Sequence, residues 1–441
     1  MSASTHDRYA RLTALHPARR LDTPPCEEAG IPAGFMPDVP EGAEHLARLL
    51  GAEPRRNRFG EHLALRRWFP GPAVTSSEIT PPEGTIDDSL LRLLAPSAPK
   101  EAADPRQWLF LDTETTGLAG GSGTYAFLVG LAWWDAGGLE VEQLFLREHS
   151  EEHSLLVALS ERLAERPVLV TFNGKTFDWP LLETRYRMTR SIPLPAPRAH
   201  LDFLHPARNL WRAQLGSVRL AELERHVLSW NRGTDVMSEL IPSIYFDFLR
   251  GGPPAPLIPI FRHNQMDLQG LAALACRVLS LLADPVQQGR DALEVWGVSR
   301  ICERRGDAAR ARTFYERSVA LDLPPEADRA ARRSLALLAK REGDFSRAVE
   351  LWNGLAGSSR AGLEAYEQLA VHYEHHERQP QRAAAVVRQA LAELRKAARL
   401  GTLAPSACER HKAQFERRLA RLDRKVGRMF PEEGSGRGVS P

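Results

Sequence analysis

The sequence predicts an α/β protein, a mixed sheet flanked by helices, followed by an all-helical domain. Between residues 106 and 283 short apolar runs alternate with helical patterns, which is typical of a sheet covered by helices. After residue 284 the strand-like runs disappear and a helical repeat replaces them. The chain has 441 residues, enough for two or three domains at roughly 150 residues each.

The composition is that of a globular protein, with 43% apolar and 26% charged residues, so disorder of the whole chain is excluded. The chain has 58 Lys and Arg against 56 Asp and Glu, and its formal charge of +2 is too small to indicate binding to a nucleic acid or a membrane. Any basic surface must therefore be local. The cysteines lie far apart without a Cys-x-x-Cys pair: Cys26, Cys276, Cys302 and Cys408. This spacing argues against a zinc ribbon or a secreted disulfide domain and fits a reducing cytoplasm.

We expect no membrane segment. The longest apolar stretch, 271–283, is interrupted by Arg277 and is too short to span a bilayer. The first twenty residues lack the apolar core of a secretion signal. The sequence therefore predicts a cytoplasmic protein.

Residues 1–105 are rich in proline and charge, which predicts a partly ordered N-terminal region. We expect short helices around 43–50 and little other regular structure. The segment NRFGEHLALRRWFP, 57–70, mixes basic and aromatic residues. Two interpretations stay open: it contacts a nucleic-acid phosphate, or it covers the next domain, and the second is favoured.

The elements of the second region, 106–283, follow from its apolar patterns. The runs WLFLDTET, TYAFLVGLAWW, LEVEQLFLRE and PVLVTFN predict four strands. Helical patterns cover 150–165, with Ser150 as its N-cap, and 176–188, and another apolar segment follows at 198–204. Three strands, a helix, a strand, a helix and this last segment predict a mixed sheet and exclude a pure Rossmann order.

Beyond residue 284 the pattern is an imperfect helical repeat. Arg-Ala pairs recur at 310–311, 347–348 and 382–383, at offsets of 37 and 35 residues. This period is close to the 34 residues of a tetratricopeptide helix pair, so we expect a tetratricopeptide-like domain over 284–430. A plain helical bundle is the alternative. The tail, 431–441, is expected to be disordered.

Three short motifs carry acidic side chains at predicted element ends. Asp112 and Glu114 end the first strand, and their i, i+2 spacing places both carboxylates on one face. Two like charges side by side repel, and a divalent cation such as Mg²⁺, which prefers oxygen ligands, relieves that cost. The sequence therefore predicts a metal site at this strand end.

The second motif, NGKTFD at 173–178, follows the strand PVLVTF at the rim where α/β proteins usually bind ligands. Asp178 can reach the same metal, Asn173 can bond a sugar or backbone group, and Phe177 can stack on a base. An ordinary helix cap is the alternative for Asp178.

The third motif opens an apolar helix, with His263 and Asp267 one turn apart on the same face. An imidazole beside a metal-bound water is a natural general base near neutral pH. Taken alone, His263 is better explained as a surface or helix-capping residue than as a base. Four acids and a histidine together predict two metal ions and an in-line phosphoryl displacement.

These residues match a known family. Asp112-Thr-Glu-Thr-Thr-Gly117, Asn173-x4-Asp178 and His263-x3-Asp267 resemble the three exonuclease motifs of the DnaQ-like DEDD superfamily, which has the RNase H-like fold. NGKTFDWPLLETR and LDFLHPARNLW resemble the YprB-type RNase H-like domain proteins. The resemblance covers about 106–283.

The resemblance implies 3′–5′ exonuclease chemistry with two Mg²⁺ or Mn²⁺ ions. It also implies that Asp112, Glu114, Asp178 and Asp267 are the metal ligands and that His263 activates the water. One feature departs from the family pattern: His263 lies four residues before the last acid, where the tyrosine branch of the superfamily has its tyrosine, and the histidine branch uses a spacing of five.

Further residues are candidates for nucleic-acid contact: Thr115, Asn173, Phe177 and Arg208. The Gly-rich segment 117–127 either approaches a nucleic-acid strand or forms a simple hairpin. Asp202 is a second partner of the site or a helix cap. Arg208, with His205 and Arg212, forms a phosphate-contacting face or a solvated one.

Positive charge also concentrates near the C-terminus, where 390–430 holds eleven Lys or Arg and four acids, a net charge of 11 − 4 = +7. This segment contacts a phosphate backbone, or the helical repeats bind a partner protein. The main hypothesis is an exonuclease acting on the 3′ end of single-stranded DNA or RNA. The alternatives are an inactive nucleic-acid-binding scaffold that recruits a protein partner through its repeats, and a structure-specific endonuclease.

Overall fold

A computed structural model describes residues 41–70, 84–117, 123–135, 137–357 and 359–429. Its centre is a seven-stranded mixed sheet in the order β1-β2-β5-β4-β3-β6-β7. The strands are β1 Glu53–Asn57, β2 Gly60–Phe69, β3 Trp108–Thr115, β4 Ala126–Asp135, β5 Gly138–Phe145, β6 Val168–Thr171 and β7 Ala199–Asp202. β6 and β7 run parallel to β3, and the other pairs are antiparallel. The predicted mixed sheet is confirmed.

The N-terminal region contributes more to this sheet than its composition predicts. Helix α2, Glu41–Leu50, lies where a short helix was expected, but the expectation of little else is wrong because β1 and β2 follow it. β2 pairs with β5 along seven positions, and Leu63 and Leu65 are buried. The segment 57–70 thus contacts the next domain, as the favoured interpretation expected, but it does so as part of a β hairpin at one edge of the sheet, and its basic residues conceal the apolar pattern. Its contact with a phosphate stays a prediction.

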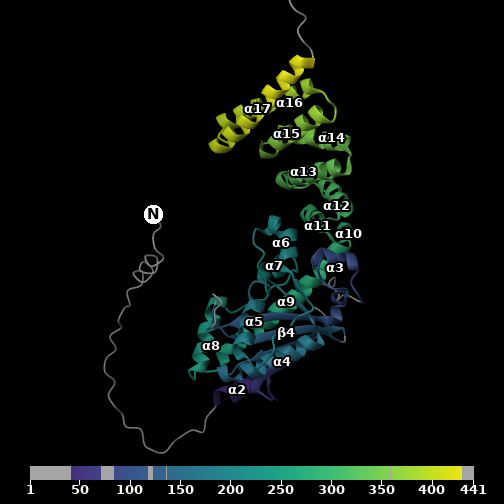
Figure 1. Cartoon of the computed structure of the whole chain (residues 1–441). Helices are drawn as coiled ribbons and strands as arrows, with labels where there is room; N and C mark the ends of the chain where they lie inside the picture. The colour runs from purple at the N-terminus through teal and green to yellow at the C-terminus, as the bar shows by residue number, and fades with distance from the viewer. Residues whose placement is uncertain (1–40, 71–83, 118–122, 136, 358, 430–441) are drawn as a thin grey trace, which may run out of the picture. The chain divides into compact units, whose positions relative to one another are not determined.

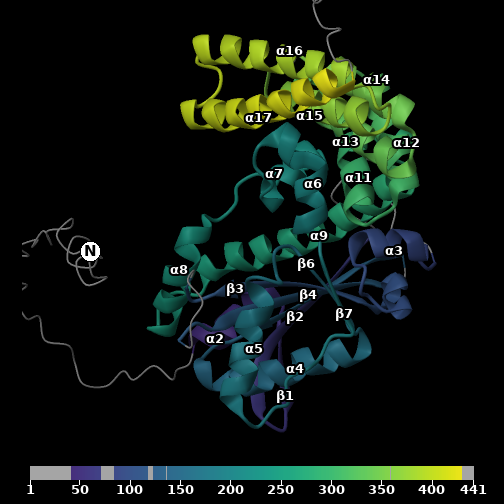
Figure 2. The same ribbon diagram turned by 45° about the horizontal axis from the view of Figure 1, so that its top comes forward.

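Alternate residues of β3 serve two separate cores. Leu109 and Leu111 belong to the core beneath α4, Glu152–Glu165, and α5, Asp178–Thr189. Trp108 and Phe110 belong to the core beneath α6, Leu204–Leu215, and the C-terminal part of α9, Ile258–Ala283. Figure 2 shows these two helical layers on opposite sides of the sheet. Because strand side chains alternate, Asp112 and Glu114 continue the face that α9 covers.

Shorter helices complete the sheet region, which we define as residues 53–283. They are α3 Asp88–Leu94, α7 Leu220–His226 and α8 Ile241–Leu249, with single 3-10 turns at Lys100–Ala103, Pro105–Gln107, His149–Glu151, Ser238–Leu240 and Ala255–Leu257. The predicted helices at 150–165 and 176–188 correspond to α4 and α5. Ser150 does not cap α4, which begins at Glu152 after a 3-10 turn.

α9 is longer than 271–283, the apolar stretch that the sequence analysis considered too short to span a membrane. Among the described residues, Ala255–Ala283 is the one helical stretch long and apolar enough to cross a bilayer, with a mean hydropathy of 1.4. Within that stretch 83% of the most apolar window is buried inside the protein. A core helix has this character, because it contacts apolar neighbours on all sides.

The chain after the sheet region is helical wherever it is described. A short helix, α10 Pro285–Gln288, precedes the helical region, which comprises α11 Ala292–Arg304, α12 Ala308–Ala320, α13 Pro325–Glu342, α14 Phe345–Leu355, α15 Ser359–His375, α16 Pro380–Arg399 and α17 Pro405–Met429. Each of these seven helices packs against the next along the chain (Figure 1). The predicted helical domain is confirmed, and its tetratricopeptide character stays a prediction.

Two Gly-Asp pairs show how the repeat is built locally. Gly306 and Gly343 have φ of 81° and 83°, a left-handed conformation that lets the preceding helix end sharply. Asp307 and Asp344 then cap α12 and α14 by accepting from the backbone N–H of Arg310 and Arg347. Equivalent start signals thus lie 37 residues apart (344 − 307).

Part of the basic C-terminal segment is neutralised inside the helical region. The buried Glu374 of α15 accepts from Arg421 at 2.6 Å and lies 3.7 Å from Arg418 and 3.8 Å from Lys425. Arg388 of α16 donates to Asp423 at 2.7 Å. These contacts hold α17 against α15 and α16, and Glu374, which lies outside the counted segment, offsets part of the positive charge of α17.

Candidate metal centre

The end of the central strand β3 carries the first two acids. Asp112 Oδ2 accepts a hydrogen bond of 2.9 Å from the side-chain amide of Asn264, which lies on α9 and is fully buried. Glu114 is 9% exposed and lies further along the same face. Thr113, between them, points to the other side and donates from its hydroxyl to Asp178 Oδ1 at 2.6 Å. β3 therefore carries two of the acids itself and orients a third, Asp178, through Thr113.

Asp178 is the first residue of α5 and follows a tight turn after β6. Asn173 has a φ of 69° in this turn, and its N–H donates to Asp202 at 2.9 Å. Asp202 also accepts from the N–H groups of Lys175 and Leu204 at 3.1 and 3.0 Å. Two of these bonds hold the turn that precedes Asp178, as expected of a partner of the site, and the third holds the first residue of α6, as expected near a helix start, so both interpretations of Asp202 stay open.

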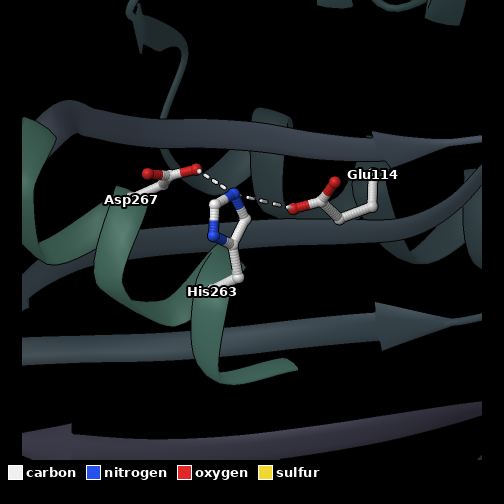
Figure 3. A group of neighbouring side chains, drawn as sticks. All are labelled: Glu114, His263 and Asp267. Carbon is white, nitrogen blue, oxygen red and sulfur yellow. Dashed lines mark ion pairs between the residues drawn. The ribbon is translucent and has the colours of Figure 1, made fainter. Parts of the chain in front are cut away.

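α9 brings the remaining two residues to the strand end. His263 Nε2 lies 3.4 Å from Asp267 Oδ2 and 3.9 Å from Glu114 Oε1 (Figure 3). One ligand atom from each of these three residues lies within 4.8 Å of the others, so they form a group that can hold a metal ion. The imidazole points from the first turns of α9 towards the strand, as Figure 3 shows.

The electrostatics of the centre are those of crowded, buried carboxylates. Burial, together with the charges of Asp267 and Asp178, raises the pKa of Asp112 well above its usual value. Burial and the charges of Asp112, Asp267 and Asp178 raise the pKa of Glu114 in the same way. Burial raises the pKa of Asp178 to about 6. The charges of Asp112, Asp178 and Asp267 thus act on Glu114, and Glu114 and Asp267 are the two acids that lie with His263 in one ligand group.

Three charged residues of the segment 224–235 also belong to the site and were missed by the sequence analysis. Asp235 Oδ1 lies 2.8 Å from His263 Nδ1. Arg232 donates to Asp267 Oδ1, to Glu224 Oε1 at 2.6 Å, and contacts Asp235 at 3.3 Å. No motif indicates them: Glu224 lies in the short helix α7, and Arg232 and Asp235 lie in the irregular connection between α7 and α8. Arg232 and Asp235 lie three residues apart in a Gly-containing loop, a pattern common in many proteins.

Of the residues proposed for nucleic-acid contact, two lie beside Asp178 and two lie elsewhere. Asn173 and Phe177 lie in the turn beside Asp178, and the Phe177 side chain is exposed. The Thr115 hydroxyl donates to Gly117 O at 2.9 Å, so it stabilises the strand end. Arg208 is exposed on α6 and lines a surface pocket with His205, Arg304 and Arg305. β3 and β4 form a hairpin around the Gly-rich segment, of which 118–122 lie outside the described residues.

The donor set fits a divalent cation. Carboxylate oxygens are the ligands that Mg²⁺ and Mn²⁺ prefer, and here several converge where burial makes their shared negative charge costly. Arg232 supplies one positive charge to this group, and its guanidinium is already engaged by the buried Glu224. The uncompensated charge therefore lies between Asp112, Glu114, Asp178 and Asp267.

Comparison with known proteins defines the class to which this fold and site belong. The model of the RNase_H superfamily (RNase_H_2) matches residues 109–279, from β3 to α9. An uncharacterized protein of Bacillus subtilis (strain 168), YprB, is 31% identical over 322 residues, which are 72% of this chain and 74% of YprB. The chain therefore belongs to the RNase H superfamily and is related to YprB. Members of this superfamily are typically nucleases, so the sheet region is an RNase H-like nucleic-acid-processing domain.

A solved structure was also matched. The family B DNA polymerase from the hyperthermophilic archaeon Pyrobaculum calidifontis aligns with a TM-score of 0.32 at 17% identity, over 45% of this chain and 29% of the polymerase chain. This similarity is too low to bear on function.

Proposed function

We propose that this protein is a metal-dependent 3′–5′ exonuclease that hydrolyses phosphodiester bonds of single-stranded nucleic acid. The observation that carries the proposal is the group formed by Glu114, His263 and Asp267, whose ligand atoms lie within 4.8 Å of one another, with Asp112 and Asp178 near enough for their charges to raise the pKa of Glu114. The polarity of cleavage comes from the resemblance of the three motifs to those of DEDD exonucleases.

The four carboxylates would hold two Mg²⁺ or Mn²⁺ ions. When bound, such ions supply positive charge that stabilises the attacking and leaving oxygens of an in-line displacement. The protein's own part is to keep the ligands in place. Asn264 orients Asp112 through one hydrogen bond, and Thr113 orients Asp178 through another. Both partners are neutral, so they fix the carboxylates without reducing their charge.

His263 is the proposed general base. Its Nδ1 lies 2.8 Å from Asp235, which favours a proton on Nδ1 and leaves Nε2 free to accept one. Nε2 faces the carboxylates of Asp267 and Glu114, the side of the ring where the substrate phosphate would lie. The Asp235 partner supports the base role despite the unusual spacing of His263 and Asp267.

The rim beside Asp178 suits an unpaired base. Phe177 is 43% exposed, unusual for a large apolar side chain, and an exposed ring next to the acids can stack on a nucleobase. Duplex DNA keeps its bases stacked inside, so this contact favours a single strand. Arg208 and its basic neighbours on α6 and α11 would bind phosphates further along the strand.

The test uses the full-length protein and single strands of DNA and RNA labelled at the 5′ end, with Mg²⁺ or Mn²⁺. Stepwise shortening from the 3′ end is expected, and Asp112→Asn should slow it by at least about 100-fold. Removing a residue that only hydrogen-bonds to a metal ligand already lowers activity by about 10–100-fold, and removing a ligand itself should cost more. Circular dichroism controls for folding. Cleavage of circular strands would show an endonuclease, and no hydrolysis of any substrate with either metal would contradict the proposal.

A further inference from the structure

The segment 224–235 runs along one face of α9 and pairs with it position by position. His263, Asp267 and Gly270 follow an i, i+4, i+7 spacing, which places them on a single face of the helix. Asp235 contacts His263, Arg232 contacts Asp267, and Glu224 lies against Gly270. The two α9 residues of the site are thus matched by partners from an irregular segment of the chain.

Glu224 is the anchor of this arrangement. It is fully buried, and a Cβ atom at position 270 would lie 1.8 Å from its Oε1, so only glycine leaves room for it. Burial raises the pKa of Glu224 to about 7, while Arg232 lowers it. A buried carboxylate without a partner is strongly destabilising, so its position requires Arg232.

Arg232 links this anchor to the metal centre. Its Nε and Nη2 contact the two oxygens of Glu224, which is the bidentate geometry of a guanidinium on a carboxylate. Nη2 also donates to Asp267 Oδ1, and the Arg232 side chain is only 8% exposed. The opposite oxygen of Asp267, Oδ2, faces His263 and the other acids.

We propose that the Glu224–Arg232 pair positions Asp267 for divalent-ion binding, with Arg232 holding Oδ1 so that Oδ2 faces the metal centre. This inference rests on the proposed metal site. Because Glu224 balances the charge of Arg232, the guanidinium stays in place when an ion binds and does not compete with it. Arginine is required rather than any cation, since a lysine has one nitrogen and cannot reproduce the fork that contacts both carboxylates.

The experiment measures Mn²⁺ affinity of the full-length protein by titration calorimetry, without substrate. Arg232→Met and Arg232→Lys should both bind Mn²⁺ about 10–100-fold more weakly than the unaltered protein, the usual cost of losing a partner of a metal ligand. Arg225→Met is the matched control, because Arg225 is exposed on α7 next to Glu224 and its loss removes the same charge. That control should bind normally.

A double variant keeps the proposal testable if Arg232→Met does not fold. Glu224→Met/Arg232→Met replaces the buried pair by unbranched apolar side chains, which is often neutral for stability. It should melt near the unaltered protein and still bind Mn²⁺ about 10–100-fold more weakly.

Normal or tighter Mn²⁺ binding by the folded double variant would overturn the positioning role, and tighter binding would identify Arg232 as a competitor. Normal binding by Arg232→Lys would equally overturn it. These results leave the proposed nuclease untouched, whereas an unaltered protein that binds no Mn²⁺ contradicts the metal centre itself.

Discussion

The carboxylate of Asp112 is oriented by a chain of side-chain amides. Gln143 on β5 donates to Asn264 Oδ1 at 2.8 Å, and Asn264 donates to Asp112 Oδ2 at 2.9 Å. Asn264 fits against the sheet because β4 has Gly130 at this point. At the scale of single residues, therefore, a glycine directly opposite Asp112 in the sheet leaves the room for the amide that orients this carboxylate.

Gly130→Ala should destabilise the protein and disturb the metal centre. A Cβ atom there would lie 2.2 Å from Asn264 Oδ1 and 2.6 Å from Nδ2, so Asn264 must move, at a cost of about 1–3 kcal/mol. Urea unfolding measures this loss. The control is Gly354→Ala in α14, where a Cβ meets nothing within 4 Å and the substitution should stabilise by about 0.5–1 kcal/mol. Equal effects at both sites would contradict the packing explanation.

His263→Asn separates a base from a metal ligand. Asparagine can still donate to Asp235 from the position of Nδ1, but it has nothing in place of Nε2. If His263 is the base, kcat falls by about 10²–10⁴-fold while Mn²⁺ affinity measured by calorimetry stays the same. A parallel loss of Mn²⁺ affinity would show instead that Nε2 is a ligand of the ion.

At the scale of elements, β2 joins two parts of the protein that are separated in sequence. It pairs with β5, and its buried His62 contacts Ser154 of α4 through Nδ1 at 2.8 Å. Asn57, at the end of β1, donates to the backbone of the same Ser154 at 3.0 Å. The β1–β2 hairpin therefore holds the N-terminal end of α4 as well as the sheet edge.

The His62 contact makes stability depend on pH in a defined direction. Burial lowers the pKa of His62 from 6.5 to about 4, so the folded protein keeps this ring neutral. Above pH 6.5 folded and unfolded chains both carry it neutral. As the pH falls from 6.5 towards 4, His62 becomes protonated in the unfolded chain while it stays neutral in the folded protein. This difference lowers the free energy of unfolding by up to about 3 kcal/mol.

Urea unfolding at pH 7.5 and pH 5 tests this. His62→Asn keeps a partner for Ser154 and removes the titrating ring, so the variant should lose less stability between the two pH values than the unaltered protein. His205→Asn, at an exposed position, should leave the difference unchanged. A pH dependence that is the same in all three proteins would show that His62 does not contribute.

The elements themselves show which parts of the fold are predictable. The strands of 106–171 and the helices that follow them were recognisable because each carries its own apolar periodicity. β1 and β2 were not recognisable. The second half of β2, GEHLALRRWF, contains two arginines that interrupt its apolar pattern, and its pairing partner β5 lies about seventy residues further along the chain. The acids at strand and helix ends were predictable for the same local reason. Arg232 and Asp235 come from a segment without periodicity, and Glu224 lies in a helix of only seven residues.

At the scale of the whole molecule, a buried glutamate connects the sheet region to the helical region. Glu294, in the first turn of α11, accepts from Trp211 of α6 and from Arg277 of α9, each at 2.8 Å. α11 approaches α6 so closely that a Cβ on Gly297 would lie 2.7 Å from the backbone of Leu210. The helices after residue 284 thus share a core with the sheet.

Glu294→Ala should therefore weaken both regions together. It leaves the buried Arg277 without its acidic partner, which costs about 3–5 kcal/mol, and it also leaves the Trp211 N–H unpaired. Thermal unfolding followed by circular dichroism should show one transition at a lower temperature. Glu316→Ala, an exposed change on α12, serves as the control and should melt normally. A separate early transition of the helical region alone would show that the two regions are not coupled.

Local sequence patterns predicted the mixed sheet and its flanking helices between 106 and 283 and the helical character of the remainder, and they singled out Glu114, His263 and Asp267, which lie together at the end of β3. Patterns of two, three or four residues encode these features, and such patterns are fixed by backbone geometry. Tertiary contacts alone place the β1–β2 hairpin at the sheet edge and pair Arg418, Arg421 and Lys425 with the buried Glu374. They also bring Arg232 to Asp267 and Asp235 to His263. Those contacts join residues far apart in the chain, and their existence depends on the path of the backbone rather than on any local pattern.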